Sequence, residues 1–391
     1  MKNPKIRFID DSIDWQENIL GNMGKTFNGL TGKTKNDFGH GTAKYITYIN
    51  VYKNTIALPN EVDSIEIDNS QNQVIYGDIL FTVSSETPEE VGLSSVWLYN
   101  ENNVYLNSFC FGYRPSNNID HKFMGYLLRS NSVRKKIILL AQGISRYNIS
   151  KNKVMEIKIS LPSLEIQKQI SSLLSDIDQK ISSQEILIQK LKNTKSALLI
   201  KTFPQENQSV PELRFDGFTN DWEQRKVKEL CLISTGKSNT QDKTDDGKYP
   251  FYVRSPIVEK SNKYLYDEEA VITIGDGVGT GKVFHYINGK YDLHQRCYRM
   301  YNFSNNLNAK YFYHIFAYLF YDRVMSMTAK TSVDSVRLDM IADMQLPTPN
   351  IYEQQKISAL FENLDNLITL HQRKLDKLKE VKSALLDKLL V

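Results

Sequence analysis

Four glycines at alternate positions are the feature of this sequence that most invites a chemical interpretation. They lie in the stretch VITIGDGVGTGKVFHY, residues 271–286, as Gly275, Gly277, Gly279 and Gly281, and Lys282 follows them. A phosphate-binding Walker loop requires the spacing G-x-x-x-x-G-K-[ST]. Counting back from Gly281-Lys282, the first glycine position holds Asp276, and the hydroxyl position after the lysine holds Val283. The spacing therefore excludes a Walker loop.

A dinucleotide-binding loop is excluded for a related reason. Such a loop leads into a helix whose N-terminus faces the pyrophosphate, whereas residues 282–287, KVFHYI, continue as a strand. Glycines at every second position between two strands instead predict a tight hairpin whose backbone lies close to another surface.

Other patterns of chemically active residues are equally incomplete. The Asn-Pro-Pro-aromatic motif of adenine methyltransferases does not occur, and Glu156-x-Lys158 is only half of a nuclease metal site. His285 and His294 flank the hairpin with no third ligand in view. Cys110, Cys231 and Cys297 form no CxxC or CxxH pair, so neither a zinc site nor a disulfide framework is expected. The sequence indicates a protein without catalytic chemistry of its own.

Charge and polarity suit a nucleic-acid surface better than a reaction. The totals are nearly balanced, with 49 Lys and Arg against 45 Asp and Glu. The distribution is uneven, however: residues 61–101 carry nine acids and no Lys or Arg, and residues 122–158 carry nine Lys or Arg and one acid. Tyrosines and asparagines are interspersed with the basic residues, a mixture typical of phosphate positioning combined with base-edge hydrogen bonding. Two ordinary solvated faces of one domain would give the same charge distribution, so that alternative to a nucleic-acid surface stays open.

The elements that position these residues occur twice. With a shift of 187, residues 170–201 align without a gap on residues 357–388, and 14 of the 32 positions are identical, including the block KSALL. The starts of the two copies, RFIDDSIDW at residue 7 and RFDGFTNDW at residue 214, align with a shift of 207. The segments between these matched ends look unrelated. Two conserved frames therefore hold two different inserts.

Each frame ends in a segment with the apolar pattern of a coiled coil. Apolar residues recur at alternating steps of four and three over about four heptads. This spacing predicts a long helix with one apolar stripe, the seam, through which it pairs with another helix. Polar residues interrupt both seams at matching places, Gln184 with His371 and Lys195 with Lys382. We expect the two helices to pair antiparallel, with Gln184 near His371; two separate amphipathic helices are the alternative. The predicted pairing residues are Ile170, Leu174, Ile177, Ile181, Gln184, Ile188, Leu191, Leu198, Ile357, Phe361, Leu364, Ile368, His371, Leu375, Leu378, Leu385 and Leu389.

The inserts show a mixed α/β pattern. Apolar β-branched runs such as KYITYINVY, QVIYGDILFTV, KYPFYVRSPIV and EEAVITIG predict strands, and MGYLLRSNSVRKKIILLAQ and NAKYFYHIFAYLF predict helices. Leu161-Pro162 and Leu346-Pro347 are predicted to mark strand exits, because the residue before proline favours extended backbone.

The whole pattern resembles the specificity subunit of type I restriction-modification enzymes. The resemblance rests on the duplicated Arg-Phe-x5-Asp-Trp starts, the Leu-Pro strand exits, the glutamine-rich helix starts EIQKQI and YEQQKI, the KSALL helix ends and the divergent inserts. It implies an α+β fold in which two α/β target recognition domains are separated by two long conserved helices paired as an antiparallel coiled coil. The implied domains are recognition domains at 1–160 and 206–346, and conserved helical spacers at 161–205 and 347–391.

The resemblance also implies a function. Each insert would read one half of a split, asymmetric DNA site. A helix of about 30 residues spans about 45 Å, enough to hold two readers about one DNA turn apart. Thr31-Gly32-Lys33 and Thr235-Gly236-Lys237, which the inserts share, would contact phosphates. The candidate DNA-binding residues are Lys33, Ser84, Ser85, Arg114, Arg134, Lys135, Arg146, Asn148, Lys237, Arg254, Thr280, Lys282, His294, Arg296 and Arg337.

Partners and cofactors follow from the same resemblance. Modification subunits would bring S-adenosylmethionine and methylate adenine, and the restriction subunit would bring ATP-driven translocation and cleavage with Mg²⁺; this chain would bind no cofactor or metal. No run of about 18 apolar residues and no apolar leader occurs, so a cytoplasmic protein is expected. A coiled-coil scaffold that holds protein partners without DNA is the alternative function.

Overall fold

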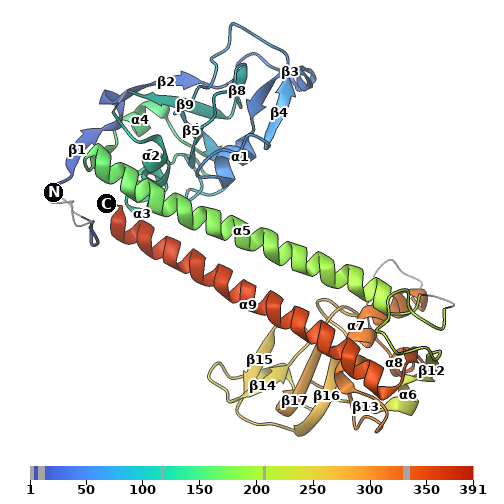
Figure 1. Cartoon of the computed structure of the whole chain (residues 1–391). Helices are drawn as coiled ribbons and strands as arrows, with labels where there is room; N and C mark the ends of the chain where they lie inside the picture. Colours follow the sequence, from blue (N-terminus) through green and yellow to red (C-terminus); the bar gives the residue numbers. More distant parts are fainter. Residues whose placement is uncertain (1–3, 8–13, 117, 206–207, 329–334, 391) are drawn as a thin grey trace. The chain divides into compact units, whose positions relative to one another are not determined.

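The computed structural model describes residues 4–7, 14–116, 118–205, 208–328 and 335–390. The chain forms two compact units, one built from residues 1–185 and 373–391 and the other from residues 186–372 (Figure 1). Each unit therefore contains one predicted insert together with part of each long helix.

The first unit is built on short, mostly antiparallel strands. A four-stranded sheet has the order β2-β9-β5-β7, and a three-stranded sheet has the order β4-β3-β8, in which β3 and β8 are parallel. The strands are β2 (Gly24–Asn28), β3 (Phe38–Ile46), β4 (Val62–Ile65), β5 (Ile79–Thr82), β7 (Ser94–Val96), β8 (Val104–Leu106) and β9 (Cys110–Pro115). A two-residue pair, β6 (Ser84–Ser85) with β10 (Tyr147–Asn148), stands beside them.

Strand β5 carries the core of the first unit because both of its faces are buried. Ile79 and Phe81 pack into one apolar cluster, and Leu80, which points to the opposite face, packs into another. The first cluster is closed by helices α2 (His121–Leu128) and α3 (Asn131–Ile138), and the second includes Val51 of helix α1 (Tyr48–Lys53). The remaining short helices are α4 (Lys151–Met155), η1 (Leu20–Asn22) and η2 (Lys35–Asp37).

The predicted strand KYITYINVY is only half correct. Strand β3 ends at Ile46, and helix α1 begins two residues later. Thr47 ends the strand because its side chain accepts a hydrogen bond from Asn50 N, 3.2 Å away, and so caps the helix. The predicted helix at MGYLLRSNSVRKKIILLAQ is likewise two helices, α2 and α3, separated at Arg129-Ser130.

The second unit contains one larger sheet. Its order is β13-β18-β16-β17-β14-β15. The strands are β13 (Leu232–Thr235), β14 (Tyr249–Tyr252), β15 (Val258–Ser261), β16 (Tyr266–Ile274), β17 (Phe284–Leu293) and β18 (Cys297–Tyr301). Strands β16 and β17 form the predicted hairpin, with eight antiparallel pairs from Tyr266↔Tyr291 to Thr273↔Phe284.

The core of the second unit repeats the two-faced arrangement. Val271 of β16 packs into a cluster with helix α7 (Ala309–Ser326), whereas Ala270 and Ile272 pack on the opposite face of the sheet. Helix α7 confirms the helix predicted at NAKYFYHIFAYLF. Short helices α6 (Val227–Leu230), α8 (Leu338–Ala342) and η3 (Thr240–Asp242) complete the unit.

A two-stranded ladder closes each copy in the same register. Strands β1 (Gln16–Ile19) and β11 (Lys158–Leu161) pair from Gln16↔Leu161, and β12 (Glu223–Lys226) and β19 (Gln345–Thr348) pair from Glu223↔Thr348. These partners differ by the same 207 and 187 that relate the two copies in sequence. The exit at Leu161-Pro162 is confirmed. The exit at Leu346-Pro347 is wrong, because β19 runs through Pro347 and ends before Pro349, the true counterpart of Pro162.

A buried glutamine fastens each long helix to its insert. Gln167 accepts a hydrogen bond from Asp120 N (3.0 Å) and donates to Pro162 O (3.0 Å). Its counterpart, Gln354, accepts from Asn308 N (2.8 Å) and donates to Pro349 O (2.7 Å). Asp120 and Asn308 cap the insert helices α2 and α7, so the same contact joins helix start to helix start in both copies.

The long helices are α5 (Leu164–Thr202) and α9 (Ile351–Leu389), and within each unit their segments run antiparallel. In the first unit Asp178 bonds to Lys382 (2.6 Å) and Glu185 to Lys379 (2.7 Å), so the numbering rises in one helix as it falls in the other. In the second unit Lys195 bonds to Asp365 (2.5 Å) and Phe203 stacks on Phe361.

The seam residues of both helices are buried or half-buried. Each lysine that interrupts a seam is neutralised by an aspartate of the other helix, and the two ion pairs are related by the internal repeat. Gln184 and His371 belong to different units, so their expected meeting stays a prediction.

Candidate nucleic-acid interface

The glycine-rich segment is the loop of the β16–β17 hairpin. Three of its glycines have positive φ: 101° at Gly277, 85° at Gly279 and 78° at Gly281. A Cβ atom on Gly275 would lie 2.6 Å from Arg296 O, and one on Gly277 would lie 2.6 Å from Arg254 O. Both distances are too short for a side chain. The glycines therefore allow the loop to lie directly against the main chain of two arginines that the sequence predicts as DNA contacts.

Asp276, between these two glycines, bonds to both arginines. Its Oδ1 accepts from Arg254 Nη1 at 3.1 Å, and its Oδ2 accepts from Arg296 Nη1 at 3.3 Å. The Asp276 side chain is 21% exposed, whereas the arginines are 46% and 65% exposed. One partly buried carboxylate thus holds two solvent-facing guanidinium groups.

His294 and Thr280 stabilise this cluster from within. The buried His294 ring accepts a hydrogen bond at Nδ1 from Arg296 N, 3.0 Å away, which requires an unprotonated nitrogen. Burial, and next the charge of Arg254, lower the pKa of His294, which favours that neutral form. Thr280 Oγ1 donates to Gly277 O at 2.7 Å inside the turn. Four predicted residues therefore gather at one loop, but two of them serve to hold it.

The other predicted cations of the second unit stand beside residues that contact this loop or His294. Lys282 N donates to Gly279 O at 2.9 Å, Val336, next to Arg337, donates from N to Gly275 O at 2.7 Å, and Ser238, next to Lys237, bridges to His294. Lys282 is exposed and stands 4.1 Å from the centre of the Tyr321 ring. Lys237 is exposed just after β13. Arg337 bonds to Asp339 at 3.2 Å, and both side chains are more than half exposed.

In the first unit, Ser84, Ser85 and Arg146 line a cleft of about 730 Å³. The pairing of β6 with β10 brings Asn148 opposite Ser84, although both serines are only 7% exposed. Arg146 lies 6.0 Å from the centre of the Phe109 ring, which is itself 57% exposed. The other residues that line the cleft are Tyr48, Ile49, Tyr52, Glu86, Glu90, Phe109 and Ser145.

Three predicted contacts of the first unit are engaged by the protein itself. Arg114 makes two bonds of 2.8 Å to the fully buried Asp78 and a third to Gln73 O. Lys33 bonds to Asp68 at 2.6 Å. Arg134 is 7% exposed, and it donates to the carbonyl oxygens of Glu89, Val91 and Gly92. Burial lowers the pKa of Arg134 to about 10.

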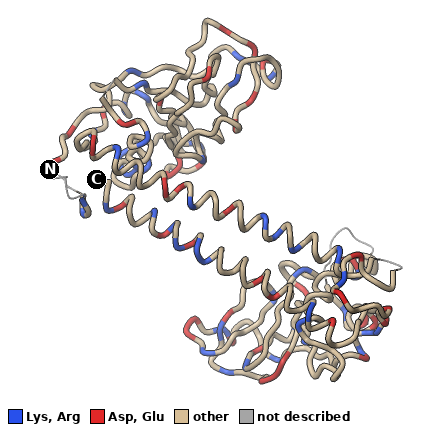
Figure 2. Tube along the Cα trace, viewed as in Figure 1, with Lys and Arg blue, Asp and Glu red and all other residues tan. Residues whose placement is uncertain are grey.

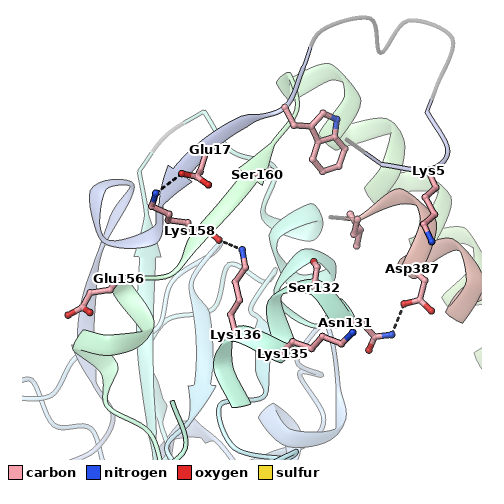
Figure 3. A pocket seen from close by; sticks show the side chains of 12 residues that line it. Lys5, Glu17, Asn131, Ser132, Lys135, Lys136, Glu156, Lys158, Ser160 and Asp387 are labelled. Carbon is pink, nitrogen blue, oxygen red and sulfur yellow. Dashed lines mark hydrogen bonds and ion pairs between the residues drawn. The ribbon is translucent and has the colours of Figure 1, made fainter. Parts of the chain in front are cut away.

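Lys135 lines an open groove of about 1200 Å³ at the closing ladder of the first unit (Figure 3). Two neighbouring lysines bind groups of the protein itself. Lys158 bonds to Glu17 at 2.7 Å, and Lys136 donates to Lys158 O at 2.5 Å. Asn131 and Asp387 join helix α3 to helix α9 across the groove, 2.6 Å apart. The groove is therefore built from the closing ladder, the insert helix α3 and the end of α9, and it carries both signs of charge.

The acidic run at residues 61–101 is partly neutralised by basic residues from outside the run. Asp68, Asp78 and Glu101 each pair with a Lys or Arg from outside the run. Figure 2 shows both signs of charge interspersed through each unit. The described residues include no group of three His, Cys, Asp or Glu placed to hold a metal ion, and none of their helices is long and apolar enough to cross a membrane.

Sequence reasoning missed Asp276 and the aromatic and acidic lining of the first cleft. For Asp276 the sequence carried no distinguishing signal, because aspartate beside glycine is common in turns whether or not its carboxylate binds other side chains. For Tyr48, Tyr52 and Glu90 no local pattern indicated a cleft, since residues 40 positions apart in sequence form it.

Comparison with known proteins agrees with this architecture. The family described as "Type I restriction modification DNA specificity domain" matches the chain twice, over residues 12–193 and 219–380. Among curated proteins, the chain is similar to the type I restriction enzyme MjaVIII specificity subunit of Methanocaldococcus jannaschii, with 24% identity covering 83% of this chain and 81% of that protein. It is also 23% identical to a putative MjaX specificity subunit of the same organism, covering 96% and 93%.

Solved structures show the same fold. The S subunit of a type I restriction-modification system from M. genitalium matches with a TM-score of 0.70 at 16% identity, covering 100% of this chain and 99% of that one. A chain from a structure concerned with complex assembly and conformational transition of the type I R-M system matches with a TM-score of 0.55 at 16% identity, covering 96% and 97%.

Proposed function

This chain belongs to the type I restriction-modification DNA specificity family, and from that premise we propose that its two inserts each read one half of an asymmetric, bipartite DNA site. The chain is a DNA sequence-recognition subunit, and the scaffold without DNA is not favoured. The observation that carries the proposal is the double family match on two frames with the same ladder register and different inserts. Identical inserts would read a repeated or palindromic sequence, whereas different inserts read two different half-sites.

The contacts to DNA would come from the hairpin loop in the second unit and the cleft in the first. Arg254, Arg296 and Arg337 are exposed and offer guanidinium donors to base edges, and Lys237 and Lys282 are placed to meet phosphates. Arg146 and Asn148 are exposed beside the first cleft. The remaining candidates support these groups: Thr280 and His294 hold the loop, and Ser84 and Ser85 form the wall of the cleft.

Lys33, Arg114 and Arg134 would act indirectly, since each is bonded within the first unit. Lys135 faces the groove at the closing ladder, where it would touch the DNA backbone or a partner. These assignments divide the candidates into readers and supports, and the division can be measured by substitution.

The proposal includes partners. A subunit of this kind would direct modification subunits, which use S-adenosylmethionine, and restriction subunits, which use ATP and Mg²⁺, to its site, and would itself perform no catalysis. We place the complex in the cytoplasm, where bacterial and archaeal chromosomal DNA lies.

The test is selection of binding sites from a random duplex library. The full chain, alone and co-expressed with a methyltransferase partner, should enrich one motif made of two different specified halves and a fixed unspecified spacer. Enrichment of a single uninterrupted motif, or of none in either preparation, would contradict the proposal.

A further inference from the structure

We infer that Asp276 is the specificity-positioning residue of the second unit, which holds Arg254 and Arg296 as a pair of guanine readers. The inference rests on the proposed function, because it names how one half of the site is read. It requires that the half-site read by the second unit contain at least one G·C pair. Asp276 itself would touch no base.

The first step concerns which arginines have donors to offer. A guanidinium group carries five N–H donors. Arg114 uses three of these donors, two on the oxygens of the buried Asp78 and one on a carbonyl. Arg214 similarly binds both oxygens of the buried Glu353 and the carbonyl of Asn220. These two arginines are structural.

Arg254 and Arg296 differ from that pattern. Each is bonded to Asp276 through Nη1 alone, and among the residues that the structure describes neither makes another side-chain hydrogen bond. The Nε and Nη2 edge of each group is thus left for a ligand. Bidentate donation from arginine to O6 and N7 is the pairing that distinguishes guanine in the major groove.

The second step concerns rigidity. Arg296 N donates to His294 Nδ1, and Gly275 N donates to Arg296 O at 2.7 Å. Gly277 lies against Arg254 O. The backbone of both arginines is therefore fixed to the loop that presents Asp276, and the carboxylate fixes their side-chain ends. Ordering long side chains before binding lowers the entropy that binding costs.

The third step concerns charge. One carboxylate between two guanidinium groups leaves the cluster with a net positive charge, so it still attracts the acceptor edge of guanine. It also prevents the arginines from swinging to the nearest phosphate, where they would add affinity without sequence preference. Asp276 therefore converts two general DNA contacts into directed ones.

The test compares Asp276→Asn with Asp343→Asn in the full chain. Asp343 is a matched control, because it also bonds two basic residues of the second unit, but these are Lys226 of β12 and Lys228 of α6 instead of the two arginines at the loop. Thermal melting of both variants checks that they fold. Site selection from the random library, followed by competition between the selected duplex and duplexes with each guanine of the second half-site replaced, gives the readout.

For the wild type we expect discrimination of about 5- to 150-fold at each guanine that an arginine reads, which corresponds to about 1–3 kcal/mol. Asp276→Asn should reduce it at least about tenfold at the strongest position while the other half-site keeps its preference, and Asp343→Asn should leave both unchanged. Arg296→Lys should lose the guanine preference and keep the salt dependence of binding.

Two outcomes would overturn the inference. One is a second half-site without a required guanine. The other is an Asp276→Asn variant that folds and keeps its full guanine discrimination. Failure of the wild type to select any bipartite motif would instead contradict the proposed function, so the two failures are distinguishable.

Discussion

The two copies of the frame make the same contacts, whereas the two inserts make different ones. Gln167 and Gln354 each tie a long helix to the cap of an insert helix, and the ion pairs Asp178–Lys382 and Asp365–Lys195 exchange places under the internal repeat. The inserts share a central strand buried on both faces, but one surrounds it with two small sheets and the other with a single six-stranded sheet. The frame thus repeats its main hydrogen bonds and ion pairs, while the reading surface differs between the copies.

The same contrast appears in the use of arginine. In the first unit Arg114 uses three of its five donors, two on a buried aspartate and one on a carbonyl. In the second unit Arg254 and Arg296 each use one donor on a shared aspartate at the surface. An arginine in a recognition domain therefore indicates neither a base contact nor a structural role by itself. The number of donors that the protein leaves unused distinguishes the two.

Among substitutions that should affect the two copies of the frame differently, the largest loss of stability is expected at Gln354. Its side chain is fully buried, and it bonds Asn308 N, Pro349 O and Asn306 O. Gln354→Ala should destabilise the second unit by about 3 kcal/mol, because each buried group left unpaired costs about 1–3 kcal/mol and part of that cost is relieved by water.

Gln167→Ala is the matched variant in the first unit. It removes two of these bonds instead of three, so its cost should be of the same sign and smaller. Denaturant unfolding monitored separately in each unit measures both. Equal loss in both units from either variant would show that the contact does not act locally.

A smaller effect should distinguish the units by pH. His314 follows its helix cap by six residues, as Tyr126 does in the first unit, and burial lowers the pKa of His314 to about 3. The unfolded chain takes up this proton near pH 6.5 and the folded one does not. The free energy of unfolding therefore falls as the pH drops below 6.5, by about 2 kcal/mol at pH 5 for this group, and the loss stops near pH 3.

His314→Phe should abolish that part of the pH dependence, since it keeps an aromatic ring against Phe361 without a titrating group. The measurement is the difference in unfolding free energy between pH 7 and pH 5 for the variant and the parent. An unchanged difference would mean that the pKa of His314 is not lowered in the folded protein.

The smallest effect is expected at the helix ion pairs. Asp365 and Lys195 are 38% and 23% exposed, so Asp365→Asn should cost no more than about 1 kcal/mol, and Asp178→Asn about the same in the first unit. Exchange of the charges in the double variant Asp365→Lys with Lys195→Asp should recover most of the loss. A double variant as unstable as the sum of its single changes would show that the pair is not coupled.

The frame could be predicted from sequence because its signals are local and occur twice. The shift of 187 aligned the helix seams, and the structure places β11 and β19 at the same shift. The motif Leu346-Pro347 was misleading as a strand exit. Proline has no backbone N–H, but it can stand within an edge strand at a position that donates no hydrogen bond to the neighbouring strand. The repeat, with Pro349 opposite Pro162, was the better guide.

The reading surface could be predicted only in part. The sequence identified the hairpin and the residue types around it, but it could not show that Asp78 would bind Arg114 from 36 positions away. Nor could it show that Thr47 would cap a helix and end a strand. Both outcomes depend on which groups the tertiary fold buries together, and a periodic pattern carries no record of that.

The central claim is that one chain carries two independent half-site readers. It is tested most directly by mapping methyladenine across the genome of cells that carry the gene for this chain. We expect one bipartite methyladenine motif to disappear when the gene for this chain is deleted and to return when the gene is restored. Replacement of residues 16–160 by another insert of the family should change one half of that motif and leave the other half intact. Loss of no motif on deletion, or a change in both halves on replacement, would contradict the account.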